Sequence, residues 1–474
     1  MQIFYALSCL ILMTSSIAFS QQPSKIWTLQ QCIDYALENN ISIKQNALNT
    51  QLAEQAMLQS KASALPNLNA NAFHNYNFGR TIDPFTNEFA TERVLANSFS
   101  LSSNVTLFNG FQTVNTIRQS RLDFLAVKYD VDKTRNDISL AIANNYLQIL
   151  FSEELVGIAN NQLGIIKQQL NRTKKLVEQG ALARGALLDI EAQEAMDELQ
   201  LVNAENQLEL SYLSLIQLLD LDSVSDFEIA KPDIDIPEGG VLIGTPGQIY
   251  DAAIGIQPQI KSAEYKVESS LKGLSVSKGG NSPRLSMGGS YGTGYSDARR
   301  NITDTLSSYA VPIGYTQSGE DVFTPFYNYN YETTPFNKQI DDNINKSFGF
   351  NLAIPIFNGL QTRTSISRAK IAVKNAQYNL QLQKNQLNKD ITQAYADATA
   401  AFKKYRATAK AVSALQEAFN YSEQKFDVGM VTSVEYNDAK NKLTKAKSDL
   451  LQAKYDYVFK TKVLNFYQGK SLAF

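Results

Sequence analysis

Two stretches near the N-terminal end of the chain alternate between apolar and polar side chains. Between residues 67 and 78, apolar and aromatic residues alternate with asparagines, and between residues 98 and 107 they alternate with Ser, Asn and Thr. A period of two is the pattern of a β-strand with unlike faces. Because a polar loop joins the two stretches, they predict a β-hairpin over about 66–108.

The same alternation returns later in the chain. Leu285, Met287 and Tyr291 mark the apolar face of one strand, and every second residue from Phe348 to Ile356 marks that of another, which predicts a second hairpin over about 283–357. Each strand is about ten residues long, with one apolar face and one face of Asn, Ser and Gly. This matches a strand that crosses a bilayer in a barrel with a wet lumen. A soluble hairpin packed on a core would show the same alternation.

Long helical stretches follow each hairpin. Residues 113–178 and 362–427 contain no Pro and almost no Gly, which predicts helices about 100 Å long. Gly180 and Gly429 come next and predict turns.

A second helix should return from each of these turns, to about Leu219 and about Leu464. Leu443, Ala446, Leu450 and Ala453 are spaced three and four apart, as in a coiled coil. Each half also begins with a helix; the first is predicted from the N-cap Thr28 to about Ser63.

The chain is a tandem duplication. Residues 107–113, Leu-Phe-Asn-Gly-Phe-Gln-Thr, return 249 positions later as Ile-Phe-Asn-Gly-Leu-Gln-Thr, and upstream the offset is 217. The difference is an insertion between Pro283 and Phe357, rich in Tyr, Asn and Gly, where a surface loop can grow. We therefore predict an α+β protein with two repeats, 21–219 and 248–474, separated by a linker over 220–247.

The first twenty residues are expected to be a secretory signal peptide. An apolar run from Ile3 to Met13 precedes Ala18-Phe19-Ser20, a small-x-small cleavage pattern, although the run has no Lys or Arg before it. The alternative is an N-terminal membrane anchor, for which the run is short.

Cleavage would remove Cys9 and leave Cys32 alone, so no disulfide is expected. With 44 basic and 46 acidic residues, the chain has no field that would recruit nucleic acid.

Four strands are too few to close a barrel. An open sheet edge in lipid would leave backbone donors and acceptors unsatisfied, at several kcal/mol each. Other copies of the chain must then complete the sheet, and cyclic symmetry is the simple solution. Three copies would supply twelve strands.

The order of helix, hairpin, long helix, turn and long helix, repeated with paired Phe-Asn-Gly junctions, resembles the outer membrane efflux protein family, the TolC-like outer membrane factors of Gram-negative bacteria. The resemblance implies a homotrimer with a 12-stranded transmembrane barrel in the outer membrane and coiled-coil helices that form a periplasmic tunnel. It further implies a tripartite efflux or type I secretion system, in which a periplasmic adaptor (membrane fusion) protein and an inner-membrane efflux pump or ABC exporter hand cargo to this channel. Transport through members of this family is passive, so the resemblance implies neither an enzyme activity nor a cofactor.

The resemblance also implies roles for residues near the helix turns. In this family, polar and ionic contacts close the tunnel at its periplasmic tip, and the matching acidic positions here are Asp438 and Glu435. Asp189 is the counterpart of Asp438 in the first repeat, and Arg184 could supply a cation. Val431 and Phe426 depart from the pattern, since the best-known member has a basic residue and a Tyr there. The implied adaptor contacts are the turn residues Gly180, Ala181, Leu182, Gly429, Met430 and Val431.

Two other classes of function are the alternatives. A secreted trimeric coiled-coil stalk or adhesin would explain the long helices and the Tyr-rich stretch 292–346, but not the two-faced strands. An envelope enzyme finds no support, because His74 is the single histidine and no Gly-x-Ser-x-Gly motif is present. We expect no catalytic residue and no metal site, and we expect the stretch 292–346 to face the cell exterior.

Overall fold

The computed structural model describes residues 26–83, 85–90, 93–221, 227–232, 236 and 244–472. The predicted signal peptide and Cys9 lie outside these residues, as does much of the predicted linker. The chain forms two compact units. The helical unit comprises residues 1–52, 125–265 and 377–474, and the sheet unit comprises residues 53–124 and 266–376.

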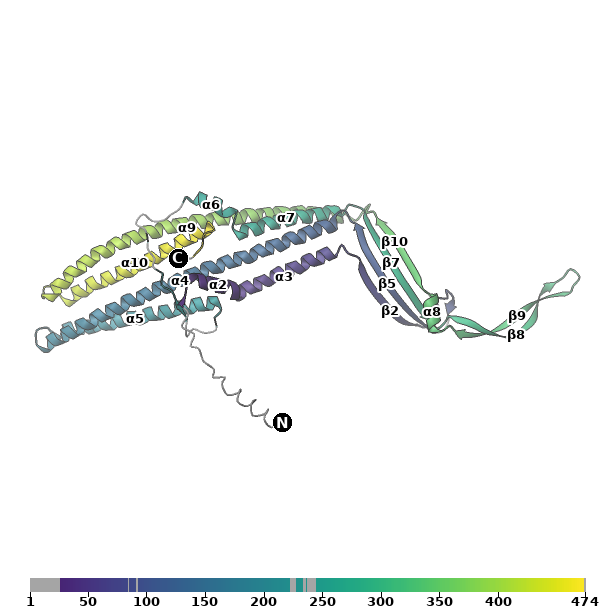
Figure 1. Ribbon diagram of the computed structural model, residues 1–474, viewed down its shortest axis with the longest axis horizontal. Coiled ribbons are helices and arrows are strands. Elements are labelled where there is room, and N and C mark those ends of the chain that lie inside the picture. Colours follow the sequence, from purple (N-terminus) through teal and green to yellow (C-terminus); the bar gives the residue numbers. More distant parts are fainter. Residues whose placement is uncertain are drawn as a thin grey trace, which may run out of the picture. The chain divides into compact units, whose positions relative to one another are not determined.

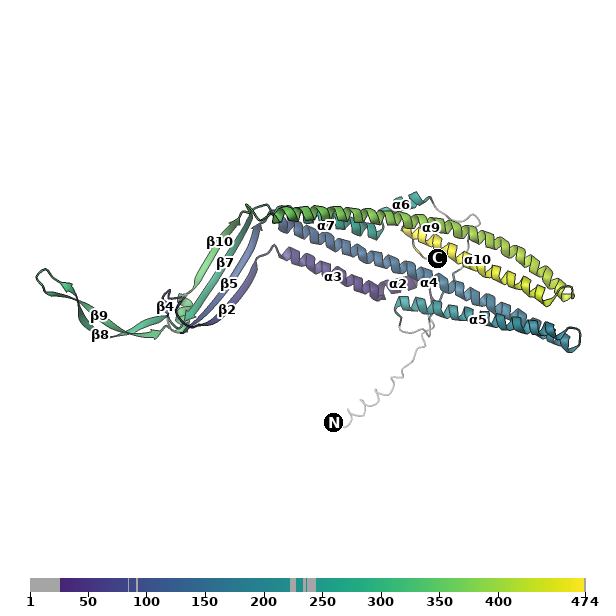
Figure 2. The ribbon, with the colours of Figure 1, turned by 180° about the vertical axis from the view of Figure 1, so that it is seen from behind.

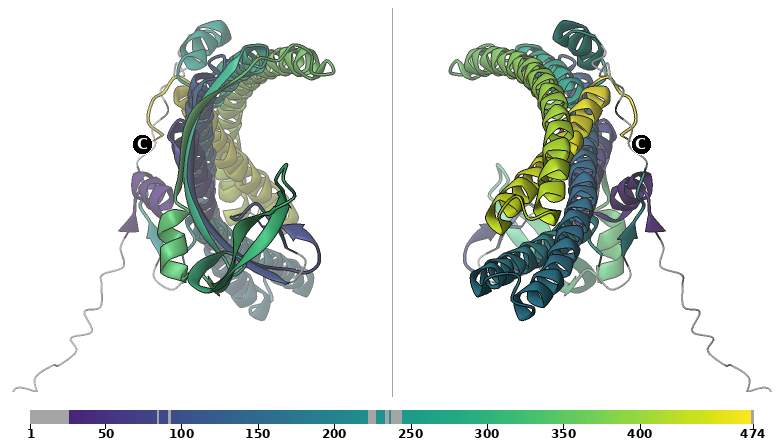
Figure 3. Two further views of the ribbon diagram at one scale, coloured as in Figure 1. Left: turned by 90° about the vertical axis from the view of Figure 1, so that its right-hand side faces the viewer. Right: turned by 90° about the vertical axis from the view of Figure 1, so that its left-hand side faces the viewer.

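Four long helices dominate the helical unit. α4 (Gln112–Glu178) and α9 (Gln361–Asp427) have 67 residues each, and their first turns belong to the sheet unit. α5 (Arg184–Leu219) runs back beside α4, and α10 (Ser433–Tyr467) runs back beside α9 (Figure 1). Figure 3 (right) shows the two helical hairpins along their helices, α4 and α5 in blue and α9 and α10 in green and yellow. At about 1.5 Å per residue, α4 and α9 are each about 100 Å long.

The largest core lies where the short N-terminal elements meet these helices. Cys32, Tyr146 and Leu215 are fully buried there, in α2 (Leu29–Asn39), α4 and α5. β1 (Ile26–Trp27) pairs in parallel with β6 (Glu228–Ile229), which lies in the predicted linker. A second cluster joins α6 (Pro246–Ile254) and α7 (Pro258–Gly279) to α9 and α10. The duplication thus produces two related cores.

The predicted first helix is interrupted, so its prediction as one continuous helix to Ser63 is wrong. α2 ends at Asn39 and α3 (Ile41–Ala62) begins after Asn40, whose ψ of 127° is not helical. The Asn40 side chain accepts from the backbone N–H groups of Ser42 and Ile43 and donates to the Leu218 carbonyl. Asn40 therefore caps α3 and anchors the break to α5. Thr28 is the N-cap of α2, as predicted.

The sheet unit contains one four-stranded antiparallel sheet, ordered β10-β7-β5-β2 (Figure 2). Its strands are β2 (Asn67–Asn77), β5 (Val94–Phe108), β7 (Arg284–Ser296) and β10 (Asn345–Ala353). β5 and β7, one from each repeat, are the central pair. β10 ends before the predicted Ile356 because Pro355 has no N–H to donate to a neighbouring strand.

The register of the sheet separates two kinds of face. Leu101 lies opposite Ala70 on one side and Tyr291 on the other, and its neighbour Ser100 lies opposite Asn71 and Gly292. Since adjacent residues of a strand point to opposite faces, Leu101 marks an apolar face and Ser100 a face of Asn, Ser and Gly.

The insertion in the second repeat is an ordered hairpin, although the sequence pattern was interpreted as a loop. β8 (Arg300–Tyr315) pairs with β9 (Asp321–Thr333) along almost their whole length. Tyr327, Tyr329 and Tyr331 alternate with asparagines in β9, a strand pattern that the loop prediction overlooked. In the first repeat, the described residues of the corresponding region form the short pair β3 (Thr81–Ile82) and β4 (Phe89–Ala90).

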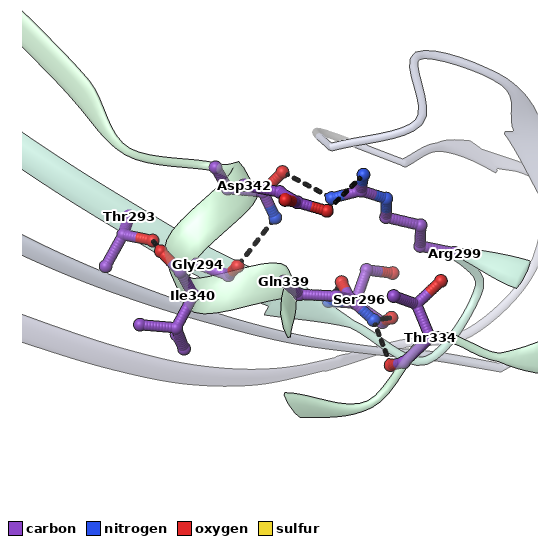
Figure 4. A network of polar contacts seen from close by, with 9 residues as sticks. Thr293, Gly294, Ser296, Arg299, Thr334, Gln339, Ile340 and Asp342 are labelled. Atoms are coloured by element: carbon purple, nitrogen blue, oxygen red, sulfur yellow. Dashed lines mark hydrogen bonds and ion pairs between the residues drawn. The ribbon is translucent and has the colours of Figure 1, made fainter. Parts of the chain in front are cut away.

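A polar network holds the base of this hairpin (Figure 4). Gln339 of α8 (Phe336–Asp342) is fully buried, accepts from the Ser296 N–H and donates to the carbonyls of Ser296 and Thr334 at 2.9 and 2.8 Å. Arg299 binds Asp342 at 3.0 Å. Both strands of the hairpin are therefore tied to α8 and β7 where they begin and end.

Candidate functional site

The two helix turns of the helical unit have the same backbone geometry. Gly180 and Gly429 adopt φ angles of 73° and 76°, in the left-handed region that favours glycine. The N–H groups of Ala181 and Met430 donate back to Leu176 and Lys425 at 2.8 Å. Glycine ends each long helix and turns the chain into the returning helix.

The returning helices begin differently. Thr432 caps α10 with a capping box, in which its hydroxyl accepts from the Glu435 N–H and its own N–H donates to Glu435 Oε2 at 2.9 Å. The Thr432 hydroxyl also donates to Glu435 Oε2 at 3.1 Å. The hydrogen bonds that the carboxylate accepts, first from the Thr432 backbone and then from its hydroxyl, hold the pKa of the Glu435 carboxyl below its ordinary value. Ala183 is the counterpart of Thr432 in α5 and offers no side-chain cap.

A cavity of about 540 Å³ lies between the two turns. Leu176, Leu182 and Phe426 supply apolar walls, while Arg172 and Asp189 add charged groups. Phe426 also stacks on Tyr436, with ring centroids 4.7 Å apart. The cavity combines apolar walls with a small number of charged groups, as ligand or peptide sites do.

A buried polar cluster joins α10 to the first repeat farther along the helices. Lys440 Nζ lies 3.4 Å from Asp197 Oδ2 and 3.3 Å from the Gln162 carbonyl oxygen. Thr444 donates to Gln162 Oε1 at 2.9 Å. Burial lowers the pKa of Lys440, and the negative charge of Asp197 opposes this shift. An ion pair withdrawn from water thus links the two repeats here, together with the hydrogen bond from Thr444.

The predicted gate residues do not form a single cluster. Asp189 lines the cavity, whereas Asp438 is exposed and pairs with Lys442 at 2.6 Å on its own helix. Arg184 is exposed at the start of α5, and Glu435 is occupied in the capping box. The predicted contact residues Gly180, Ala181, Leu182, Gly429 and Met430 are exposed, and Val431 is half-buried.

Neither the buried cluster nor Arg172 was predicted from the sequence. Lys440 and Asp197 are 243 positions apart, and no local pattern marks either as buried, because a lysine or aspartate in a helix normally faces water. A weak signal was available in Lys440 itself, three residues before Leu443 on the predicted coiled-coil face.

None of the helices in the described residues combines the length and the apolar content needed to cross a membrane. Within the same residues no group of three or more His, Cys, Asp or Glu side chains is arranged to hold a metal ion.

Comparisons with known proteins agree with one another. The family model described as outer membrane efflux protein matches residues 32–220 and 249–468. The outer membrane protein TolC of Vibrio cholerae is 23% identical over 449 residues, covering 94% of this chain and 91% of TolC. The alkaline protease secretion protein AprF of Pseudomonas aeruginosa is 20% identical over 443 residues, covering 92% and 82%. A crystal structure of CusC covers 94% of this chain and 92% of its own, with a TM-score of 0.74 at 16% identity, and this likeness of fold confirms the predicted α+β class.

Proposed function

Because the chain belongs to the outer membrane efflux protein family, we propose that three copies of it form a duct that takes cargo from a periplasmic adaptor and an inner-membrane pump. The protein is an outer-membrane channel for efflux or secretion, and its helices form a periplasmic tunnel. The family is one of passive channels and not of enzymes. Membership favours this function over the stalk or adhesin.

The two-faced sheet is the observation that supports assembly into a trimer. One face is apolar and suits lipid, and the other is lined by Asn, Ser and Gly and suits water. β2 and β10 are the outer strands, each hydrogen-bonded on one side only. Since an open edge in a bilayer is costly, neighbouring copies complete the sheet, and three copies make a ring of twelve strands.

We assign the gate to the acidic residues that follow the turns. Asp438 and Glu435 on α10 and Asp189 on α5 are exposed within nine residues of a turn glycine, so in a ring they repeat as a band of negative charge. Arg184, also exposed, supplies a positive charge close to the first turn. Charged rings at a constriction favour counter-ions and exclude co-ions. The channel is expected to prefer cations when it opens.

We assign adaptor contact to the two turns and the cavity between them. The exposed residues Leu182 and Met430 and the half-buried Val431 offer apolar surface at the turns. The cavity between them has room for an apolar side chain of a partner, and its lining includes the charged residues Arg172 and Asp189. The partner is a membrane fusion protein, supplied in turn by an efflux pump or an ABC exporter.

Conductance tests this function directly. The detergent-purified protein should have the mass of a trimer and give discrete conductance steps in planar bilayers. Asp438→Ala should lower the cation preference, whereas Asp456→Ala, an exposed acid far along the same helix, should leave it unchanged. A detergent-independent trimer without conductance would instead indicate a stalk.

A further inference from the structure

The four-stranded sheet carries very little charge. β2, β5, β7 and β10 contain no Asp or Glu, and their basic side chains are His74 in β2, Arg284 at the start of β7 and Lys346 in β10. Because none of the four strands has a carboxylate, none can neutralise Arg284 from within the sheet.

Arg284 lies on the polar face of this sheet. Its neighbour Leu285 is paired with Leu352 on the apolar face, so Arg284 belongs to the opposite face. The Arg284 guanidinium donates to Thr106 Oγ1 at 3.2 Å, and Thr106 lies opposite Ser286 on the polar face. Arg284 is also exposed. Its charge is therefore presented on the side that is lined by Asn, Ser and Gly.

The other two basic side chains belong to the apolar face. Lys346 lies opposite Tyr291, and Lys346 Nζ is 5.7 Å from the centre of the Tyr291 ring. His74 lies opposite Asn97, which is four residues before Leu101 and so shares its face. The arginine at the start of β7 is thus the one charged residue on the polar face of these four described strands.

The segments that adjoin this end of the sheet are basic as well. They are the start of α4, the end of α7 and the start of α9. Residues 109–122, 270–283 and 354–376 contain eight basic residues and no acidic one, although the whole chain has 44 basic and 46 acidic residues. Arg284 therefore lies between segments that carry only positive charge.

A cavity of about 290 Å³ has Arg284 in its lining. Asn109, Gln112 and Ser282 contribute polar side chains, and Ala353 of β10 is among the apolar residues. Among the described residues that line the cavity there is no Asp or Glu. Within the described part of the chain the guanidinium makes one hydrogen bond, the one described above, although it carries five N–H donors. The remaining donors are available to a ligand.

We propose that Arg284 and this cavity form an anion-binding site inside the channel, at the periplasmic end of the barrel, and that the site takes carboxylate or phosphate groups of the cargo. This rests on the proposed function, because the polar face lines a duct only when copies of the chain complete the barrel. Three copies place three guanidinium groups around the duct at one level. A guanidinium can bind a carboxylate or a phosphate with two parallel N–H bonds.

The site has the opposite charge to the acidic residues near the helix turns. Cargo that has passed these acids meets positive charge where the tunnel becomes the barrel, and a charged ring favours counter-ions. Because Arg284 is exposed, a bound anion keeps part of its water. Binding is therefore weak enough for the cargo to leave, as conduction requires.

Block of the current by a multivalent anion tests the site. The unmodified trimer in a bilayer of phosphatidylcholine, a lipid without net charge, should be blocked by tripolyphosphate added on the side of the barrel mouth. Arg284→Gln should raise the half-blocking concentration about tenfold, since a hydrogen bond between charged groups is lost. Arg284→Lys keeps the charge without the two-pronged geometry and should give an intermediate value. High salt should weaken the block.

Two further variants locate the site on one face of the sheet. Lys346→Gln is the matched control, because it removes one positive charge per chain from the apolar face, and it should leave the block unchanged. Ser286→Glu places a carboxylate two residues from Arg284 on the polar face, and it should remove the block while the arginine is still present. If Arg284→Gln does not assemble, Ser286→Glu and Arg284→Lys test the site.

The outcomes separate this site from the channel function. An unchanged half-blocking concentration in Arg284→Gln or in Ser286→Glu would overturn the site, and so would an equal loss of block in Lys346→Gln. If the unmodified protein conducts but tripolyphosphate does not block it, the site is absent and the channel function stands. If the unmodified protein neither assembles nor conducts, both proposals fail.

Discussion

Lys440 of α10 and Asp197 of α5 form an ion pair of 3.4 Å although each side chain is only 3% exposed. The two residues come from different repeats, so the pair links the second helical hairpin to the first. Lys440 also donates to the Gln162 carbonyl. A buried pair of this kind costs little while both partners are present, but loss of one leaves a buried charge without a partner.

Removing one partner should therefore be worse than removing both. Lys440→Met is expected to lower the free energy of unfolding by about 3–5 kcal/mol, and the double variant Lys440→Met/Asp197→Leu to recover much of this loss. Chemical unfolding in detergent, followed by circular dichroism, measures all three proteins.

The exposed pair Asp438–Lys442 is the control. Its side chains are well solvated, so Lys442→Met should cost at most about 1 kcal/mol. Equal losses for Lys440→Met and Lys442→Met would show that burial of the first pair has no energetic consequence.

Acid should loosen the start of α10. Because the folded-state pKa of Glu435 lies below its ordinary value, its carboxylate adds stability that is complete above the unfolded-state pKa and is lost as the pH falls through the folded-state pKa. Amide exchange in the first turn of α10, corrected for intrinsic rates, should show protection falling on acidification. Glu435→Gln removes the titrating group, so the variant should show a smaller fall, and an unchanged fall would contradict the assignment.

The start of α5 should accept a better cap. Ala183 is the N-cap and has no side-chain acceptor, so Ala183→Ser is expected to raise the free energy of unfolding by about 0.5–1 kcal/mol. Thr432→Ala, the reverse change at the corresponding position of α10, should lower it by a similar amount. Thermal unfolding measures both, and a change of the same sign in the two variants would count against the capping argument.

Gly110 should tolerate a side chain less well than Gly180. Both have positive φ angles, so Gly→Ala strains either backbone by about 1 kcal/mol. A Cβ at Gly110 would in addition approach the Gly279 carbonyl oxygen and the Ser282 side chain to 2.5 Å, whereas at Gly180 it meets no atom of the described residues within 4 Å. Gly110→Ala should therefore reduce the yield of folded protein well below that of Gly180→Ala, as measured by size-exclusion chromatography.

The helix boundaries were predictable because they depend on local chemistry. Absence of Pro marked 113–178 and 362–427, within one residue of α4 and α9, and the turn glycines marked their ends. The break at Asn40 was missed because the carbonyl that holds the Asn40 side chain, that of Leu218, is 178 positions away. The β8–β9 hairpin was missed because its alternating Tyr and Asn residues resemble loop composition.

The candidate site also has one part that the sequence predicts and one part that it does not. The acidic residues near the turns could be named from the repeat and the family resemblance, but their surroundings could not. Asp438 pairs with Lys442 four residues along the same helix, which is a local contact, whereas only the packing shows that Asp189 lines a cavity with Phe426 of the other repeat.

The amino-acid sequence by itself determined the duplication, because the two halves can be compared residue by residue. It also determined the two-faced strands, the long helices and the glycine turns, because each of these depends on residues within a few turns of one another. The tertiary structure decided which strands are neighbours, which helix stripe is covered and which left exposed, and which lysine is buried beside which aspartate. These depend on contacts between residues that lie from tens to hundreds of positions apart, and their energies arise only when packing removes both partners from water.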